Sequence, residues 1–186
     1  MQNKIAKDEI EKNPGVITAN IMMDIIKNND YKVWIISDVM QNGLYITNMN
    51  NESRSIVAFT DNKLALSYTN RKNIINTIKL AFGKQLLLIG TSILHIHKIV
   101  NMRSAFQQNV MNQHVQPMDQ IIINPNYEGD YFLPLSLSYI ANHIINNVGN
   151  HNVFVDEKED VTKVVFDKEL GKYIETSGFE EEFDYS

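Results

Sequence analysis

Two stretches of the chain decide its fold: Ser55–Asn62, which reads SIVAFTDN, and Met118–Tyr127, which reads MDQIIINPNY. Each is an apolar run rich in β-branched residues that ends abruptly on polar, turn-forming residues. Pro125 has no N–H group to donate to a neighbouring strand, so the second run must stop beside it. Each stretch therefore predicts a buried strand that is followed at once by a turn.

Upstream of these stretches, the pattern predicts two helices and a β-meander. A short helix is expected over 5–12, and Val16–Asn28 carries apolar residues at helical spacing. Lys32–Val39 contains a β-branched and aromatic run typical of a strand with little water contact on either face. Gly43–Thr47 and Arg54–Thr60 follow as the next two strands, separated by an asparagine-rich turn.

Downstream, helices are expected to alternate with extended segments. Asp61 or Asn62 can cap a short helix that runs through Ser67. The spacing of Met102 and Phe106, continued four residues later, favours another helix. The remaining expected elements are extended segments at Ile74–Leu80 and Gln85–Ile89, a strand or helix at Thr91–Lys98, a helix over 101–113, a strand at Asp119–Asn124, a helix at Leu133–Val148, and extended segments at Val153–Val155 and Val161–Phe166. This order predicts an α+β fold, a single domain with a mixed, mostly antiparallel β-sheet flanked by helices.

The composition indicates an ordinary soluble protein. The chain has 186 residues, of which 44% are hydrophobic and 21% charged. No apolar run approaches the roughly 20 residues that a membrane-spanning helix needs, so we expect no membrane contact. Residues 1–9 mix charges and lack the apolar region of a secretory signal, so we expect a cytoplasmic protein. The absence of cysteine excludes disulfides, thiolate catalysis and cysteine-based zinc sites.

Charged residues are unevenly distributed along the chain. Residues 151–186 carry eleven acidic and four basic residues, whereas residues 1–150 carry eleven acidic and thirteen basic ones. A body so close to neutral has no broad basic surface for phosphate contacts, which argues against nucleic-acid binding. We predict a domain over 1–150, followed over 151–186 by an acidic C-terminal extension with a β-hairpin and a flexible tail.

The order of these signatures resembles the SseB N-terminal-domain family. The resemblance rests on Lys32–Ile36 as a first strand, Val57–Asp61 as a strand ending in Phe-Thr and a polar residue, and Ile121–Pro125 as a buried strand ending in Asn-Pro. It covers roughly residues 16–148, and the polar segment at 101–116 departs from the family pattern. The resemblance implies a small α/β-type binding or accessory domain, a type also found in toxin-immunity neighbourhoods, and it implies no catalytic residues.

The two strand ends provide one candidate site. Asn124 precedes a proline and can hold the following turn through its amide, while Phe59 is expected in the core. The alternative is that Thr60, Asp61 and Asn124 converge at one end of the sheet and bind a small ligand. The residue pattern leaves both interpretations open.

Signals of catalysis or metal binding are weak throughout the sequence. His95 and His97 would share a face in a strand but point apart in a helix. No hydrolase elbow, phosphate-binding loop or dinucleotide fingerprint is present in the sequence. We therefore expect a non-enzymatic protein with no catalytic residues, no cofactor and no metal.

The acidic segment at 178–186 provides a second candidate site. It combines four carboxylates with Phe179, Phe183 and Tyr185. One interpretation is a solvated tail. The other is a peptide that docks on a basic, partly apolar groove, with its aromatic residues as anchors.

These observations favour a protein-interaction or accessory domain, such as an immunity-type protein, that binds another protein. The alternative is a small-ligand-binding or sensor domain that uses the loops near Thr60 and Asn124. A third hypothesis is a structural subunit that assembles with itself.

Overall fold

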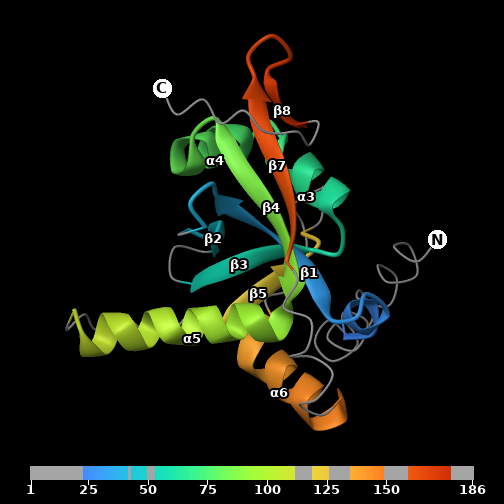
Figure 1. Cartoon of the computed structure of the whole chain (residues 1–186), viewed down its shortest axis with the longest axis vertical. Helices are drawn as coiled ribbons and strands as arrows, with labels where there is room; N and C mark the ends of the chain where they lie inside the picture. Colours follow the sequence, from blue (N-terminus) through green and yellow to red (C-terminus); the bar gives the residue numbers. More distant parts are fainter. Residues whose placement is uncertain are drawn as a thin grey trace.

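The structure is a computed structural model that describes residues 23–41, 43–49, 53–111, 119–125, 135–148 and 159–176. Within these residues, one eight-stranded sheet lies at the centre of the molecule with helices around it (Figure 1). The strands are β1 (Lys32–Asp38), β2 (Ile46–Met49), β3 (Ser53–Phe59), β4 (Gln85–Ser92), β5 (Gln120–Ile123), β6 (Leu135–Ser136), β7 (Asp160–Asp167) and β8 (Lys172–Glu175). The helices are residues 23–28, α3 (Asn62–Thr69), α4 (Ile75–Phe82), α5 (Ile93–Asn109) and α6 (Leu137–Val148).

The sheet is mixed but mostly antiparallel. Its strand order is β6-β5-β3-β1-β4-β7-β8, and β2 pairs with β3 beside the end of β1. The pairing of β3 with β5 is parallel, whereas the other strand pairs in the described residues are antiparallel. The predicted α+β class, with a mixed sheet flanked by helices, is therefore confirmed.

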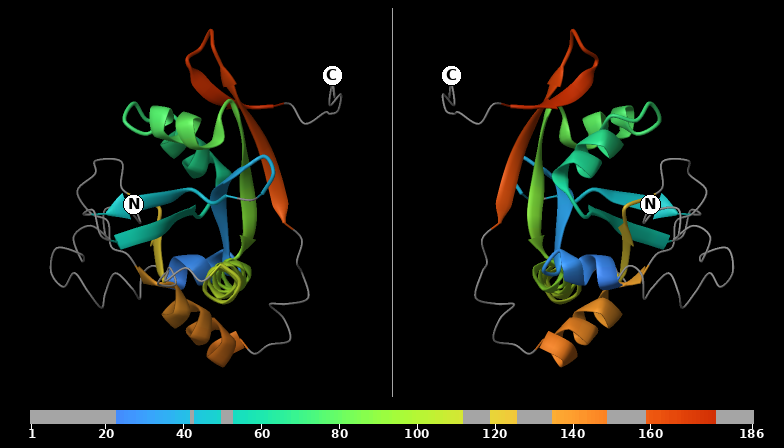
Figure 2. Two further views of the ribbon diagram at one scale, coloured as in Figure 1. Left: turned by 90° about the vertical axis from the view of Figure 1, so that its left-hand side faces the viewer. Right: turned by 90° about the vertical axis from the view of Figure 1, so that its right-hand side faces the viewer.

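Side chains of the central strands alternate between two hydrophobic cores. Val33 and Ile35 of β1 point into a core made with the 23–28 helix, α5 and α6, whereas Ile36 points into a second core beneath α3 and α4. Figure 2 shows α3 and α4 on one side of β4 and the β7–β8 hairpin. Because β1 is covered on both faces, four of its seven residues are buried and the other three are half-buried, as its apolar sequence predicts.

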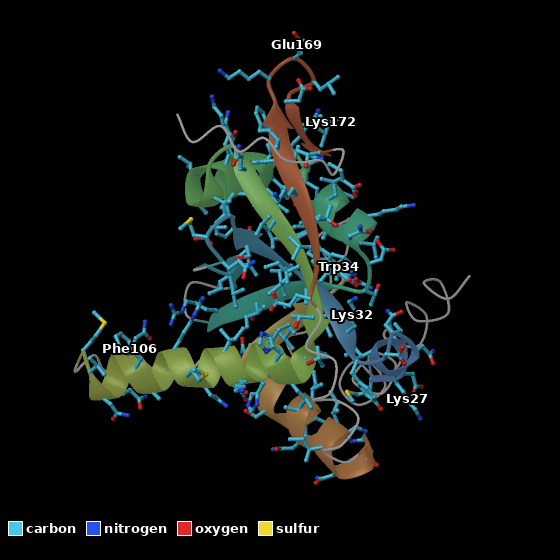
Figure 3. The ribbon with its side chains drawn as sticks, in the orientation of Figure 1. Lys27, Lys32, Trp34, Phe106, Glu169 and Lys172 are labelled. Atoms are coloured by element: carbon cyan, nitrogen blue, oxygen red, sulfur yellow. The ribbon has the colours of Figure 1, made fainter. Side chains whose placement is uncertain are left out.

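A glycine in β4 makes room for the chain's one tryptophan. Gly90 lies directly opposite Trp34 of β1. A Cβ atom on Gly90 would approach the Trp34 ring to 2.9 Å and the Lys32 side chain to 2.8 Å. Lys32 in turn lies over the Trp34 ring and pairs with Asp160 of β7 (Figure 3). Three neighbouring strands are thus packed closely around a position that has no side chain.

We predict that Gly90→Ala destabilises the fold by about 1–3 kcal/mol, because the added methyl group overpacks the Trp34 ring. Trp34 is the sole tryptophan, so its fluorescence reports the displacement directly. Chemical unfolding and the emission maximum of the native protein should both change. At Gly171 an added Cβ atom would meet nothing within 4 Å, but φ is 67°. Gly171→Ala should therefore lower stability through its backbone while leaving the emission maximum unaltered.

Several predicted elements are confirmed. The described part of Val16–Asn28 is helical at 23–28, and the strands expected at Lys32–Val39, Arg54–Thr60, Gln85–Ile89 and Asp119–Asn124 all form. At Thr91–Lys98, which fits either structure by pattern, β4 continues to Ser92 and α5 begins at Ile93. The predicted 5–12 helix and the Val153–Val155 segment lie outside the described residues.

One predicted element and two predicted boundaries are wrong. Ile74–Leu80 is not extended: Ile74 is the N-cap of α4 and the rest lies in that helix, because Ile78 and Phe82 pack at helical spacing beneath the sheet. The helix predicted at Leu133–Val148 begins only at Leu137, since Leu135 and Ser136 first pair with β5. Gly43–Thr47 contributes only a bridge at Leu44 before β2 begins at Ile46.

Strands β7 and β8 form a hairpin that belongs to the same sheet. β7 pairs with β4 over six residue pairs, and Tyr173 of β8 is buried in the second core. Asn70, at the end of α3, donates from its amide to the Tyr173 carbonyl at 2.8 Å and accepts from the Tyr173 N–H at 2.7 Å. The Tyr173 hydroxyl donates to the Gly83 carbonyl. The sheet therefore continues through residue 175. Within the described ranges, no helix is both long and apolar enough to cross a membrane.

Candidate functional site

The strand ends that the sequence singles out do meet in the structure. β3 and β5 lie side by side in parallel, which places Thr60 and Asn124 just beyond their ends. Asn124 adopts a left-handed backbone with φ of 50°, a conformation that asparagine tolerates better than most residues. Its amide oxygen accepts from the Thr60 N–H at 3.0 Å, and its amide nitrogen donates to the Thr60 hydroxyl at 2.9 Å.

The polar groups of this junction hold the chain itself. Asp61 caps α3, accepting from the Leu64 N–H at 2.9 Å. Arg71 lies over the Tyr68 ring and donates to the Pro125 carbonyl. The Asn124 amide thus ties the end of β5 to the end of β3, while its expected bonds to the turn that follows it and a ligand at this strand end both stay predictions.

We predict that Asn124→Ala destabilises the protein by about 3 kcal/mol. The substitution removes two hydrogen bonds, and alanine tolerates the left-handed backbone less well than asparagine does. Asn124→Gly also removes the two hydrogen bonds, but glycine adopts the left-handed backbone without steric cost, so this variant should lose less stability than the alanine variant. Urea unfolding of the three proteins measures both effects. Equal losses in the two variants would mean that the left-handed backbone carries no cost.

A second polar cluster joins β5 to the start of α6. The Asp119 carboxylate accepts from the hydroxyl of Ser136 and from both the N–H and the hydroxyl of Ser138. Partial burial acts to raise the pKa of Asp119, but these hydrogen bonds outweigh it, so the pKa lies below its ordinary value. The carboxylate therefore acts as a cap for the first turn of α6.

The depressed pKa of Asp119 predicts a pH-dependent contribution to stability. The carboxylate stabilises the folded state above its unfolded pKa of about 4, and this contribution is lost as the pH falls through the lower folded pKa. Asp119→Asn should therefore cost about 1 kcal/mol at pH 7, a difference that shrinks in acid. Thermal unfolding from pH 7 to pH 3 tests this, with the exposed Asp24→Asn as a matched control. A difference that is constant with pH would contradict it.

The histidine pair lies on a helix and not on a strand. His95 approaches Glu159 at 3.2 Å, while His97 makes a 3.2 Å hydrogen bond with Asn101 one turn further along α5. The two rings thus have separate partners. Among the residues that the structure describes, no group of three or more metal-ligating side chains could hold an ion.

The most unusual surface of the described chain is the outer half of α5. Ser92 caps the helix where β4 ends, and Ile93, Ile96 and Val100 anchor its first half in the core. The second half extends beyond the sheet, and Figure 3 labels Phe106 on this part. Three apolar residues along this half and at the C-cap are 63%, 55% and 66% exposed, namely Met102, Phe106 and Val110. We call these three residues the α5 stripe.

The formally charged side chains of α5 and α6 have one sign. Within Ile93–Asn109 the charged residues are Lys98 and Arg103, and no carboxylate is present. Helix α6, which packs against α5, carries no charged side chain at all. The stripe is therefore an apolar surface flanked by cations, which suits a partner that presents apolar anchors among acidic residues.

The spacing of the α5 stripe predicted a helix but not its exposure. Met102, Phe106 and Val110 recur at helical intervals, and apolar residues at that spacing ordinarily face a core. The polarity of the neighbouring residues could have marked them as exposed, because it leaves little apolar surface on the rest of this half of the helix. These polar neighbours are Asn101, Gln107, Gln108 and Asn109. The other predicted partner-binding residues, Phe179, Phe183 and Tyr185, lie outside the described residues.

Comparison of the chain with models of known protein families, with curated proteins and with solved structures gave no match.

Proposed function

We propose that this chain is a non-enzymatic protein-interaction domain whose docking surface is the α5 stripe. The observation that carries the proposal is the exposure of Met102, Phe106 and Val110 along one face of a helix. Exposed apolar side chains that lie singly are common, but a contiguous row on a projecting helix is a frequent feature of binding surfaces. The helix presents its row at i, i+4 and i+8, the spacing used when a helix engages a partner through its apolar side chains.

The way α5 is attached supports this role. Its first half is buried against the sheet and α6, so the second half is held rigidly although its apolar side chains make little contact with the body. A rigid, preformed helix has little conformational entropy left to lose when a partner binds. The domain thereby presents three apolar anchors at fixed positions.

The SseB-like resemblance fits the same proposal. It rests on the Phe59-Thr60-Asp61 and Asn124-Pro125 signatures at the ends of β3 and β5, and it implies an accessory or immunity-type protein. The hydrogen bonds of Asn124 to Thr60 give this signature a structural role, which is to hold the ends of β3 and β5 together. We place the binding activity on α5 and not on the signature residues.

We predict that Phe106→Ser abolishes capture of a partner while leaving the fold intact, because a half-exposed side chain contributes little to the core. Tagged wild-type protein and the variant would each be incubated with a lysate of the encoding organism, and bound proteins identified by mass spectrometry. Leu80→Ser is the matched control, since Leu80 is 89% exposed on α4.

A photo-crosslinking amino acid at Met102 would then locate the contact in the captured complex. Equal capture by wild type, Phe106→Ser and Leu80→Ser would contradict a docking role for the stripe. Capture lost equally in both variants would indicate non-specific apolar adhesion and would contradict it as well.

A further inference from the structure

We infer that the α5 stripe binds the acidic-aromatic segment, residues 178–186, of a second copy of this chain. This inference rests on the proposed function and names an occupant for the same surface. The stripe is flanked by Lys98 and Arg103, so its charge complements that of the segment. The acidic residues of the segment are Glu180, Glu181, Glu182 and Asp184.

The spacing of apolar side chains is the same in both parts. Met102 and Phe106 are four residues apart on α5, as are Phe179 and Phe183 in the acidic-aromatic segment. Residues four apart lie on one face of a helix, about 6 Å along its axis. If the segment binds as a helical turn, both phenylalanines face the stripe and its carboxylates remain on the rim, near the cations.

The area of the α5 stripe favours a short peptide over a folded surface. Three partly exposed side chains offer on the order of 300 Å² of apolar area, whereas a stable interface between folded proteins buries roughly 1,200–2,000 Å² in total. Stripe-to-stripe pairing of two α5 helices would therefore be too small to hold a dimer by itself. A peptide with two aromatic anchors needs less area.

The segment cannot reach the stripe of its own molecule with both anchors. Thr176 donates its N–H to Lys163 of β7, which lies beside Leu87 of β4. From there the path to α5 runs about 17 Å along β4 to Ser92 and then about 21 Å along the helix to Phe106. Figure 1 places β8 at the top and the outer end of α5 at the lower left.

The length of chain between Thr176 and Phe179 determines whether the segment comes from the same molecule or from a second copy. Phe179 follows Thr176 by three residues and can extend at most about 10 Å from it. The stripe begins at Met102, about 15 Å along α5 from Ser92. Because α5 leaves the end of β4 that is remote from β8 and runs away from β8 (Figure 1), Phe179 cannot contact the stripe in the same molecule. Simultaneous docking of Phe179 and Phe183 requires a second copy. The contact joins two different surfaces, so it produces either rings, reciprocal dimers or open chains.

The inference is tested by the mass of the full chain in solution over a wide range of concentration, using analytical ultracentrifugation. Wild-type protein should gain mass as concentration rises, and the gain should weaken at high salt because the carboxylates face cations. Phe106→Ser and the double variant Phe179→Ala/Phe183→Ala should each raise the dissociation constant about tenfold or more. Leu80→Ser should associate as wild type does.

A mixing experiment separates docking from misfolding. Phe106→Ser retains its segment, and the double variant retains its stripe, so an equimolar mixture contains one intact contact. We expect this mixture to form a dimer and no larger species, although each variant alone is monomeric. Circular dichroism of each variant verifies that both are folded.

Three outcomes would overturn the inference. Wild-type protein that stays monomeric at every concentration excludes self-docking. Association that survives the double variant but not Phe106→Ser would mean that two stripes pair with each other. Two folded variants that do not associate when mixed would exclude the segment as occupant. A monomeric wild type that still captures another protein through Phe106 would leave the proposed function standing while this inference fails.

Discussion

The pairing of β1 with β4 is the contact around which the rest of the molecule is arranged. All seven residues of β1 pair with β4, and β4 continues the sheet to β7 on its other side. Successive side chains on these strands point to opposite faces, so each strand contributes to both hydrophobic cores. A shift of one residue in this register would move Ile36 and Leu88 out of the core beneath α3 and α4.

The end of β4 determines where α5 goes. Ser92 is the last residue of the strand and also the cap of the helix, so no loop separates the two elements. Strand and helix therefore share one rigid connection, and the burial of Ile93, Ile96 and Val100 fixes the direction of the helix. The helix is longer than the surface available to cover it, which leaves the α5 stripe exposed.

The α5 stripe and the acidic-aromatic segment are complementary in charge and in the spacing of their apolar side chains. The stripe is flanked by cations and lies on a rigid helix, whereas the acidic-aromatic segment follows the last strand of the sheet. We propose that the stripe on one copy binds the acidic-aromatic segment of another copy. The polar clusters at Asn124 and Asp119 serve a different purpose, since their hydrogen bonds join neighbouring elements of the scaffold.

By itself, the sequence determined the fold class, the buried central strands and the capped start of α3, because these depend on local periodicity, turn chemistry and an N-cap side chain. It left open whether Asn124 holds the chain or binds a ligand. The β-branched residues of α4 led to the prediction of an extended segment, but this part of the chain is a helix that buries Ile78. Only the tertiary structure decided which apolar residues are core and which are surface. The α5 stripe has the spacing of a core face, and it is exposed because the sheet ends before the helix does.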